Sequence, residues 1–246
     1  MTVLRRRSKP TLLARLRRFW VLIAVVAIAA AVIGYLLASR PELRVHSIAV
    51  SGNRVVDPRT VITRAAIPLE ANVWFLNTGA IAKRIETIPY VATASVHRHL
   101  LANIELAITE RVPVACVVAG DEGYTIDAQL RVLAHGCPGA LPRYVVSLAA
   151  PPKDGDFLPP DEAGRLRNDD AALAGAGIAV RELSFDRFGS LDATTATGLA
   201  LQLGDDSDLA SKARLIGPIL ESTQKRLHNV RGIDLRAPST PIVTFK

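Results

Sequence analysis

The chain has 246 residues, with 30 Lys and Arg against 23 Asp and Glu, and a formal net charge of +7. Seven of the basic residues lie within the first eighteen positions, and no acidic residue precedes Glu42. The rest of the chain is therefore formally neutral. It gives no support to nucleic-acid binding, although a pI of about 9.8 taken alone suggests it.

An uncharged, strongly apolar stretch follows the basic residues and runs from Phe19 to Ser39. About 20 helical residues cross a hydrocarbon core roughly 30 Å thick, and Trp20 and Tyr35 lie near the two ends, where aromatic rings favour the membrane interface. A cleaved signal peptide is the alternative, but its apolar region spans only about 7–15 residues. We therefore expect an uncleaved transmembrane helix over residues 19–39.

The basic residues also predict the orientation of this helix. Lys and Arg are retained on the cytoplasmic side, so residues 1–18 are expected to form a cytoplasmic tail. Residues 40–246 would then be exported. The prediction is a single-pass type II protein of the inner (plasma) membrane, with its C-terminal part periplasmic or otherwise extracytoplasmic.

The first exported segment has the pattern of a compact α+β unit. In chain order we expect a strand over Val45–Ser51, a helix from Asp57-Pro58, a helix after Gly79, and strands over Val91–His97 and Asn103–Glu110. The last strand alternates most clearly, with Ile104, Leu106 and Ile108 on one face. The order is strand, helix, helix, strand, strand.

The remaining segment predicts a mixed sheet with flanking helices, so the whole chain is expected to be α+β. The expected strands are Val112–Ala119, Tyr124–Asp127, Leu130–Ala134, Arg143–Leu148, Val180–Phe185, Gly198–Leu203, Val230–Arg236 and Pro241–Lys246. One helix should follow Asp161, and another should follow Asp206–Asp208 and be kinked or restarted at Gly217-Pro218. A terminal strand has one certain neighbour and can present a free edge.

A search for catalytic, metal and cofactor patterns finds none that is complete. Ser222 and Lys225 match Ser-x-x-Lys, but the Ser-Asp-Asn and Lys-Thr-Gly elements of that enzyme class are absent from the sequence. His97 and His99 share a strand face without further metal ligands, and Asp205, Asp206 and Asp208 fit a helix N-terminus rather than a calcium loop. We therefore predict no enzyme activity, no cofactor and no small-molecule substrate.

Two cysteines, Cys116 and Cys137, lie in the exported part, where a disulfide could persist. They are separated by 21 positions and by two expected turns. A disulfide is possible, but the sequence does not show whether the two Cβ atoms meet. We expect two unpaired, partly buried thiols.

Several short motifs, taken in order, resemble the FtsQ/DivIB family of bacterial cell-division proteins. They are VHSIAVSGNR at 45–54, IPYVATASVHR at 88–98, IELAITERVPVA at 104–115, the hairpin at 124–133, Leu203-Gly204 followed by the Lys212 helix, and GIDLR at 232–236. Each motif is weak alone, but their order and the predicted membrane topology span essentially the whole chain.

The resemblance implies a POTRA domain over residues 44–113 and a β domain over residues 114–246. It also implies a non-catalytic divisome scaffold at the septum, with FtsB- and FtsL-type single-span proteins as partners. In the family the last strand is the partner-binding edge, paired by a segment of FtsB. Here that edge maps to Ala237, Pro238, Ser239, Thr240, Pro241, Ile242, Val243, Thr244 and Phe245. Because the two prolines lack a backbone donor, pairing is expected to concentrate on Ile242–Phe245.

The sequence leaves two other functions as alternatives. A POTRA-containing factor for protein export or assembly is one, but no series of barrel-type strands follows in the sequence. A membrane-anchored cell-wall enzyme is the other, and the motif search gives it no support. The interpretation favoured by the sequence is a division scaffold.

Overall fold

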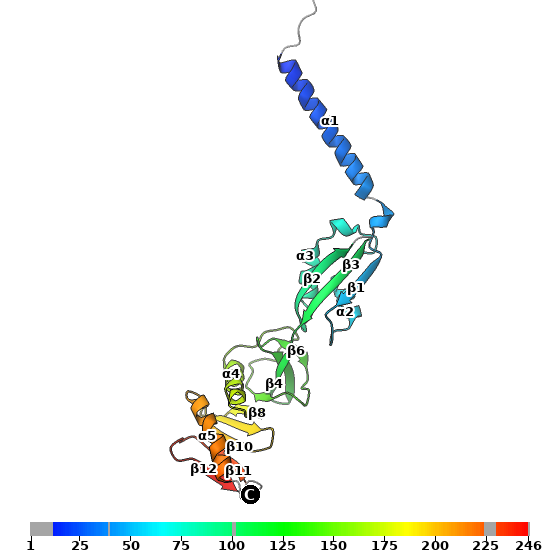
Figure 1. The fold of residues 1–246 in the computed structure, drawn as a ribbon. Coiled ribbons are helices and arrows are strands. Elements are labelled where there is room, and N and C mark those ends of the chain that lie inside the picture. The colour runs from blue at the N-terminus through cyan, green and yellow to red at the C-terminus, as the bar shows by residue number, and fades with distance from the viewer. Residues whose placement is uncertain (1–11, 39, 100–101, 224–229, 246) are drawn as a thin grey trace, which may run out of the picture.

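A computed structural model describes residues 12–38, 40–99, 102–223 and 230–245 (Figure 1). It begins with a long helix, α1 (Leu12–Ala38), which starts seven residues ahead of the predicted span. Within it, Phe19–Leu36 has a mean hydropathy of 2.6 and no buried residue. Among the described residues α1 alone is long and apolar enough to cross a membrane.

A three-stranded sheet backed by two helices follows α1. Its elements are η1 (Pro41–Leu43), β1 (Ser47–Ser51), α2 (Pro58–Ala65), η2 (Val73–Phe75), α3 (Thr78–Ile85), β2 (Val91–His99) and β3 (Asn103–Glu110). The strand order is β1-β3-β2, with β1 parallel and β2 antiparallel to the central β3. This is the predicted order of elements, although α3 begins at Thr78, one residue before Gly79.

The core of this first unit follows from the sequence pattern. Ile104, Leu106 and Ile108 are all buried against the helices, as the alternation along β3 predicts. The α2 helix begins as expected, because the Asp57 side chain accepts a hydrogen bond from the backbone N–H of Arg59 and Pro58 occupies the first helical turn.

A nine-stranded mixed sheet makes up the second unit. Its strands are β4 (Pro113–Ala119), β5 (Glu122–Asp127), β6 (Val132–His135), β7 (Arg143–Val145), β8 (Val180–Phe185), β9 (Leu191–Thr195), β10 (Ala200–Gly204), β11 (Val230–Asp234) and β12 (Ile242–Phe245). They lie in the order β12-β11-β10-β9-β8-β7-β4-β5-β6. The two ends of the sheet are therefore β12 and β6.

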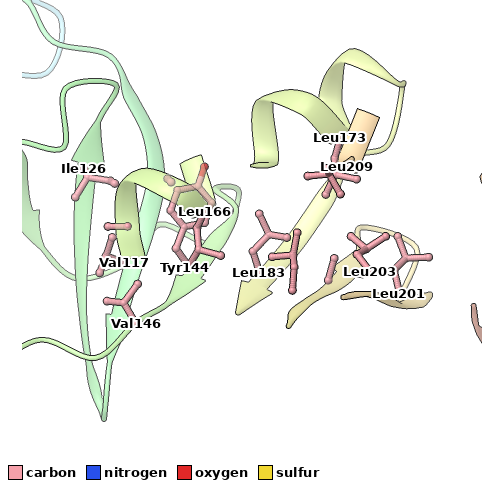
Figure 2. Packing of buried hydrophobic residues seen from close by; sticks show 14 of the residues in the cluster. Val117, Ile126, Tyr144, Val146, Leu166, Leu173, Leu183, Leu201, Leu203 and Leu209 are labelled. Atoms are coloured by element: carbon pink, nitrogen blue, oxygen red, sulfur yellow. The ribbon is translucent and has the colours of Figure 1, made fainter. Parts of the chain in front are cut away.

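Two helices, α4 (Glu162–Gly175) and α5 (Leu209–Ser222), pack with this sheet over one continuous apolar core. Figure 2 shows Leu166 and Leu173 of α4 among side chains contributed by strands, including Tyr144 of β7 and Leu183 of β8. The computed structure thus confirms an α+β protein with one N-terminal apolar helix.

The Glu110-Arg111 pair lies where the first sheet passes into the second. The Glu110 carboxylate accepts hydrogen bonds from the backbone N–H groups of Arg54, Val55 and Val56, at 2.7–3.0 Å. Arg111 Nη1 donates to Asp127 Oδ2 of β5 at 2.6 Å, in a largely buried ion pair. This part of the family motif therefore has structural roles on both sides of the junction. The predicted boundary between residues 113 and 114 stays a prediction.

Some expected elements of the second unit differ from the structure. The α5 helix runs on through Gly217 and Pro218 and does not restart there; the expected kink stays a prediction. The strand at Arg143 is shorter than expected and ends at Val145. A further strand, β9, forms where no strand was expected.

The cysteines also differ from expectation. Cys116 of β4 and Cys137, just after β6, are joined by a disulfide, with Cα atoms 5.4 Å apart. The intervening β5 makes this possible, because Gly123 of β5 offers no side chain and a Cβ there would collide with the Cys137 sulfur. Our expectation of two unpaired thiols is therefore not what the structure shows.

Candidate functional site

The final described strand, β12, lies at one end of the nine-stranded sheet. It pairs antiparallel with β11, with Asp234 opposite Ile242 and Gly232 opposite Thr244. Within the described part of the chain β11 is its one strand neighbour. In Figure 1, β12 lies at the end of the protein remote from α1. One backbone edge of β12 therefore faces away from the sheet.

Gly232 allows three strands to approach closely at this end of the sheet. A Cβ on Gly232 would lie 3.0 Å from the Ala200 carbonyl oxygen of β10 and 3.2 Å from the Thr244 hydroxyl of β12. Thr244 Oγ1 donates to the Gly232 carbonyl at 3.1 Å. A depression beside this contact is lined by Ala200, Gln202, Arg231, Gly232, Ile233, Asp234 and Thr244. Glycine in the GIDLR motif thus serves the packing of β12.

The same motif holds β11 in place at its C-terminal end. Ile233 and Leu235 are buried in the core, and Leu235 N–H donates to the Gln202 carbonyl of β10 at 2.7 Å. Arg236 pairs with Asp234, and its side-chain hydrogen bond lowers the pKa of that carboxyl. These contacts hold Asp234, which lies opposite Ile242 of β12, in place.

The Leu203-Gly204 motif and Lys212 support β10, the strand on which β11 lies. Gly204 has a φ of +69°, and its Cα lies close to the Arg236 side chain, so a Cβ would meet Arg236 Cγ at 3.1 Å. Lys212 of α5 is buried and donates through Nζ to the carbonyl oxygens of Leu203 and Asp205, at 2.7 and 2.5 Å. These motif residues therefore stabilise β10 and its contact with the end of β11, on which β12 packs, and are not part of the exposed edge of β12.

The predicted partner-binding residues fall into two groups. Ile242–Phe245 form β12 itself, and the exposed fractions of Ile242 and Phe245 are 60% and 41%. Ala237–Pro241 form the exposed connector from β11, which includes a turn closed by the Thr240 N–H and the Ala237 carbonyl at 3.0 Å. Both prolines lie in the connector, so neither removes a donor from β12.

The opposite end of the sheet is covered by the chain itself. Val132 N–H of β6 donates to the Asp156 carbonyl, and Gly155 N–H donates back to the Val132 carbonyl, both at 2.8 Å. The Leu158 N–H bonds the Leu130 carbonyl at 2.9 Å, and the Phe157 ring lies under the Arg131 guanidinium. Segment 155–158 therefore pairs along β6, and the disulfide links Cys137, in the turn after β6, to Cys116 of β4.

The residues considered for catalysis or metal binding occupy structural positions. Ser222 Oγ donates to the Ile219 carbonyl at the end of α5, and Lys225 lies outside the described residues. His99 pairs with Glu105, and Asp206 pairs with Arg165. Among the described residues no group of three or more His, Cys, Asp or Glu side chains is placed to hold a metal ion.

Comparison with known proteins adds to this geometry. Residues 43–111 match the model of the POTRA domain, FtsQ-type. The chain is 31% identical to the cell division protein FtsQ of Streptomyces venezuelae over 205 residues, which cover 80% of this chain and 73% of that protein. For FtsQ of Mycobacteroides abscessus the identity is 28%, over 90% of this chain and 68% of the relative. For FtsQ of Mycolicibacterium smegmatis it is 33%, over 48% and 36%.

An FtsQ-type POTRA domain, preceded by an apolar helix long enough to span a membrane and followed by a second sheet, defines the class of POTRA-containing proteins. The match to the Streptomyces protein covers most of both chains. The chain belongs to the FtsQ family of cell division proteins. This confirms the family predicted from the motifs.

Proposed function

We propose that the protein is a non-catalytic scaffold of the divisome whose β12 edge binds a segment of an FtsB- or FtsL-type single-span protein. In this proposal α1 holds the protein in the membrane with its N-terminus in the cytoplasm. Both sheets are exported, and the protein is enriched at the septum. The observation that carries the proposal is the position of β12 at an open end of the sheet, with Ile242 exposed.

Strand addition is the mode of recognition that fits this edge. An incoming extended peptide can form backbone hydrogen bonds along β12, which supply affinity, while side-chain contacts supply specificity. The exposed Ile242 and Phe245 side chains offer apolar contacts at the two ends of the strand. With four residues, β12 offers a short edge, so we propose that the connector Ala237–Pro241 adds contacts beside it.

The names of the relatives support division rather than protein export or cell-wall cleavage. All three relatives described above are called cell division proteins. The FtsQ-type POTRA match also supports this assignment, because the matched model is specific to the FtsQ type of the domain. We therefore propose that the protein links division proteins in the envelope and carries out no reaction itself.

Pull-down from membranes with an FtsB-like partner tests the proposal. Val243→Pro removes a backbone donor in the middle of β12, and deletion of Pro241–Lys246 removes the strand. Both variants should lose capture while the rest of the ectodomain remains folded, as judged by circular dichroism. Val243→Thr keeps the backbone donor and strand propensity, and serves as the matched control that should retain capture. Unchanged capture by both disrupted variants would rule out β12 as the binding edge.

A further inference from the structure

An exposed apolar turn lies on the three-stranded unit, far along the chain from β12. Trp74 and Phe75 in η2 have exposed fractions of 54% and 75%, and the nearby Leu69 is 66% exposed. Tryptophan and phenylalanine are costly to leave in water, and exposed apolar clusters mark interaction sites. No part of the described chain covers these three side chains.

Several contacts hold this turn against the first unit, with its aromatic side chains exposed. Val73, in the same turn, is fully buried and packs in the core of the first unit. The Asn72 side chain accepts a hydrogen bond from the Trp74 N–H at 2.8 Å. Arg98 of β2 donates through Nη2 to the Leu76 carbonyl at 2.6 Å. Trp74 and Phe75 are therefore exposed in a turn that is hydrogen-bonded and packed against the rest of the unit.

The turn is tied directly to the chain that leaves α1. Arg44 forms an isolated antiparallel bridge with Asn72, and the Val45 N–H donates to the Ala71 carbonyl at 3.1 Å. Only five residues separate Arg44 from Ala38, the last residue of α1. Even a fully extended connector of that length reaches about 20 Å, and η1 shortens it. Figure 1 shows the segment before α3 at the end of the first unit from which α1 departs.

Two exposed arginines lie at the turn: Arg98 donates to the Leu76 carbonyl, and Arg44 lies in the connector that bridges to Asn72. Arg40, also exposed, precedes them in the same connector, which carries the acidic Glu42 as well. Arg44 is paired with Glu70, so it is partly neutralised. Exposed arginines next to aromatic rings are typical of the membrane interface, where the rings occupy the headgroup level and the cations meet lipid phosphates.

We propose that Trp74, Phe75 and Leu69 insert into the interfacial layer of the bilayer that α1 spans, so that the POTRA unit rests on the membrane surface. The partner is lipid because the turn is tethered within a few residues of α1. Its aromatic side chains are those expected at headgroup depth, and arginines flank it. The proposal rests on α1 being a membrane anchor, but not on the binding of any protein to β12.

Tryptophan fluorescence can test this, because the sequence contains just two tryptophans, Trp20 and Trp74. In the full chain carrying Trp20→Phe, Trp74 becomes the sole reporter. The matched control carries Trp20→Phe, Trp74→Phe and Phe188→Trp, which places the reporter at an exposed turn of the second unit (78% exposed). Both proteins are reconstituted into vesicles of phosphatidylcholine and phosphatidylglycerol. Quenching is measured with acrylamide in the water and with lipids brominated near the headgroup.

Trp74 should be quenched by the brominated lipid and be several-fold less accessible to acrylamide than the reporter at position 188. Equal accessibility of the two reporters, with no quenching of Trp74 by lipid, would overturn the proposal. Protection of Trp74 only in native membranes that contain other division proteins would also overturn it, in favour of a protein partner. A third variant, Trp74→Phe with Trp20 retained, reports whether α1 is inserted, and so separates failure of the anchor from failure of the turn.

Discussion

The two ends of the nine-stranded sheet are finished in different ways. At the β6 end, segment 155–158 adds backbone hydrogen bonds along the strand, and the Cys116–Cys137 disulfide fastens the following turn. At the β12 end the described chain adds no further strand, and Ile242 remains largely exposed. Unpaired strand edges tend to recruit other chains, and proteins usually cover or charge them.

The protein therefore covers one edge of its sheet, at β6, with its own chain and a disulfide, and the described chain leaves the other edge, at β12, uncovered. The four residues of β12 carry no charged side chain, although edge lysines are a common protection against unwanted pairing. An edge that is kept short, apolar and accessible suits a strand that awaits a partner. On this account the covered edge contributes stability and the open edge contributes binding.

Breaking the disulfide should have the largest effect, and it should act on stability alone. Cys137→Ala removes the bond at an exposed position and leaves buried Cys116 in place. Because the bridge closes a loop with a separation of 21, its loss should lower the free energy of unfolding by about 3 kcal/mol. Urea denaturation with and without reductant measures this, and capture of the FtsB-like partner should not change. Equal stability of the oxidised and reduced wild type would contradict the role of the covered edge.

Placing a charge on the open edge should have the converse effect. Ile242→Lys should weaken partner binding about 10- to 100-fold, or roughly 1.4–2.7 kcal/mol, because it replaces an apolar contact and charges the edge. Ile242 is 60% exposed, so the free energy of unfolding should change little. Phe188→Lys, at an exposed turn between β8 and β9, is the control and should bind as wild type does. A titration that finds equal affinities for the two variants would argue against the open edge as the binding site.

The smallest effect on stability is expected from a change at Asp169. This residue lies in α4, the helix that packs over the middle of the sheet, between its two edges. Burial, and then the nearby Asp206, raise the pKa of this carboxyl from 3.8 to about 6, against the opposing effect of Arg165. Because the folded pKa is the higher one, stability declines as the pH rises from about 4 to about 6, where the folded protein loses its extra proton. Asp169→Asn should therefore add about 1 kcal/mol at neutral pH and nothing below the unfolded pKa.

Denaturation across this pH range measures the effect. Partner binding should be the same in both proteins, since Asp169 lies at neither edge. A wild type and a variant with parallel stability profiles from acid to neutral pH would show that the carboxyl does not titrate as described.

The sequence predicted the first unit well because its local and long-range preferences agree. Asp57-Pro58 starts α2, and the alternation of Ile104, Leu106 and Ile108 sets the buried face of β3. In the second unit, β9 was missed because its buried residues, Leu191, Ala193 and Thr195, are mostly small or polar and give a weak alternating signal. The location of the terminal strand was predicted, but its position at the end of the sheet depends on nonlocal pairing with β11.

Other features could not be read from sequence for a clear physical reason. The disulfide depends on how closely β4 and the turn after β6 approach across Gly123, and spacing along the chain does not reveal that distance. The covered edge depends on segment 155–158, a proline-flanked loop whose sequence has no strand pattern. The closeness of the exposed Trp74 turn to α1 likewise depends on a nonlocal contact, the bridge between Arg44 and Asn72.

Hydrogen exchange of the full chain, with and without an FtsB-like partner, tests the central claim most directly. If the partner adds a strand to the open edge, amides of Ile242–Phe245 should exchange more slowly in the complex. Amides of β6 and of segment 155–158 should exchange at unchanged rates. Slowed exchange that appears elsewhere on the protein, with none at Ile242–Phe245, would contradict β12 as the partner-binding edge.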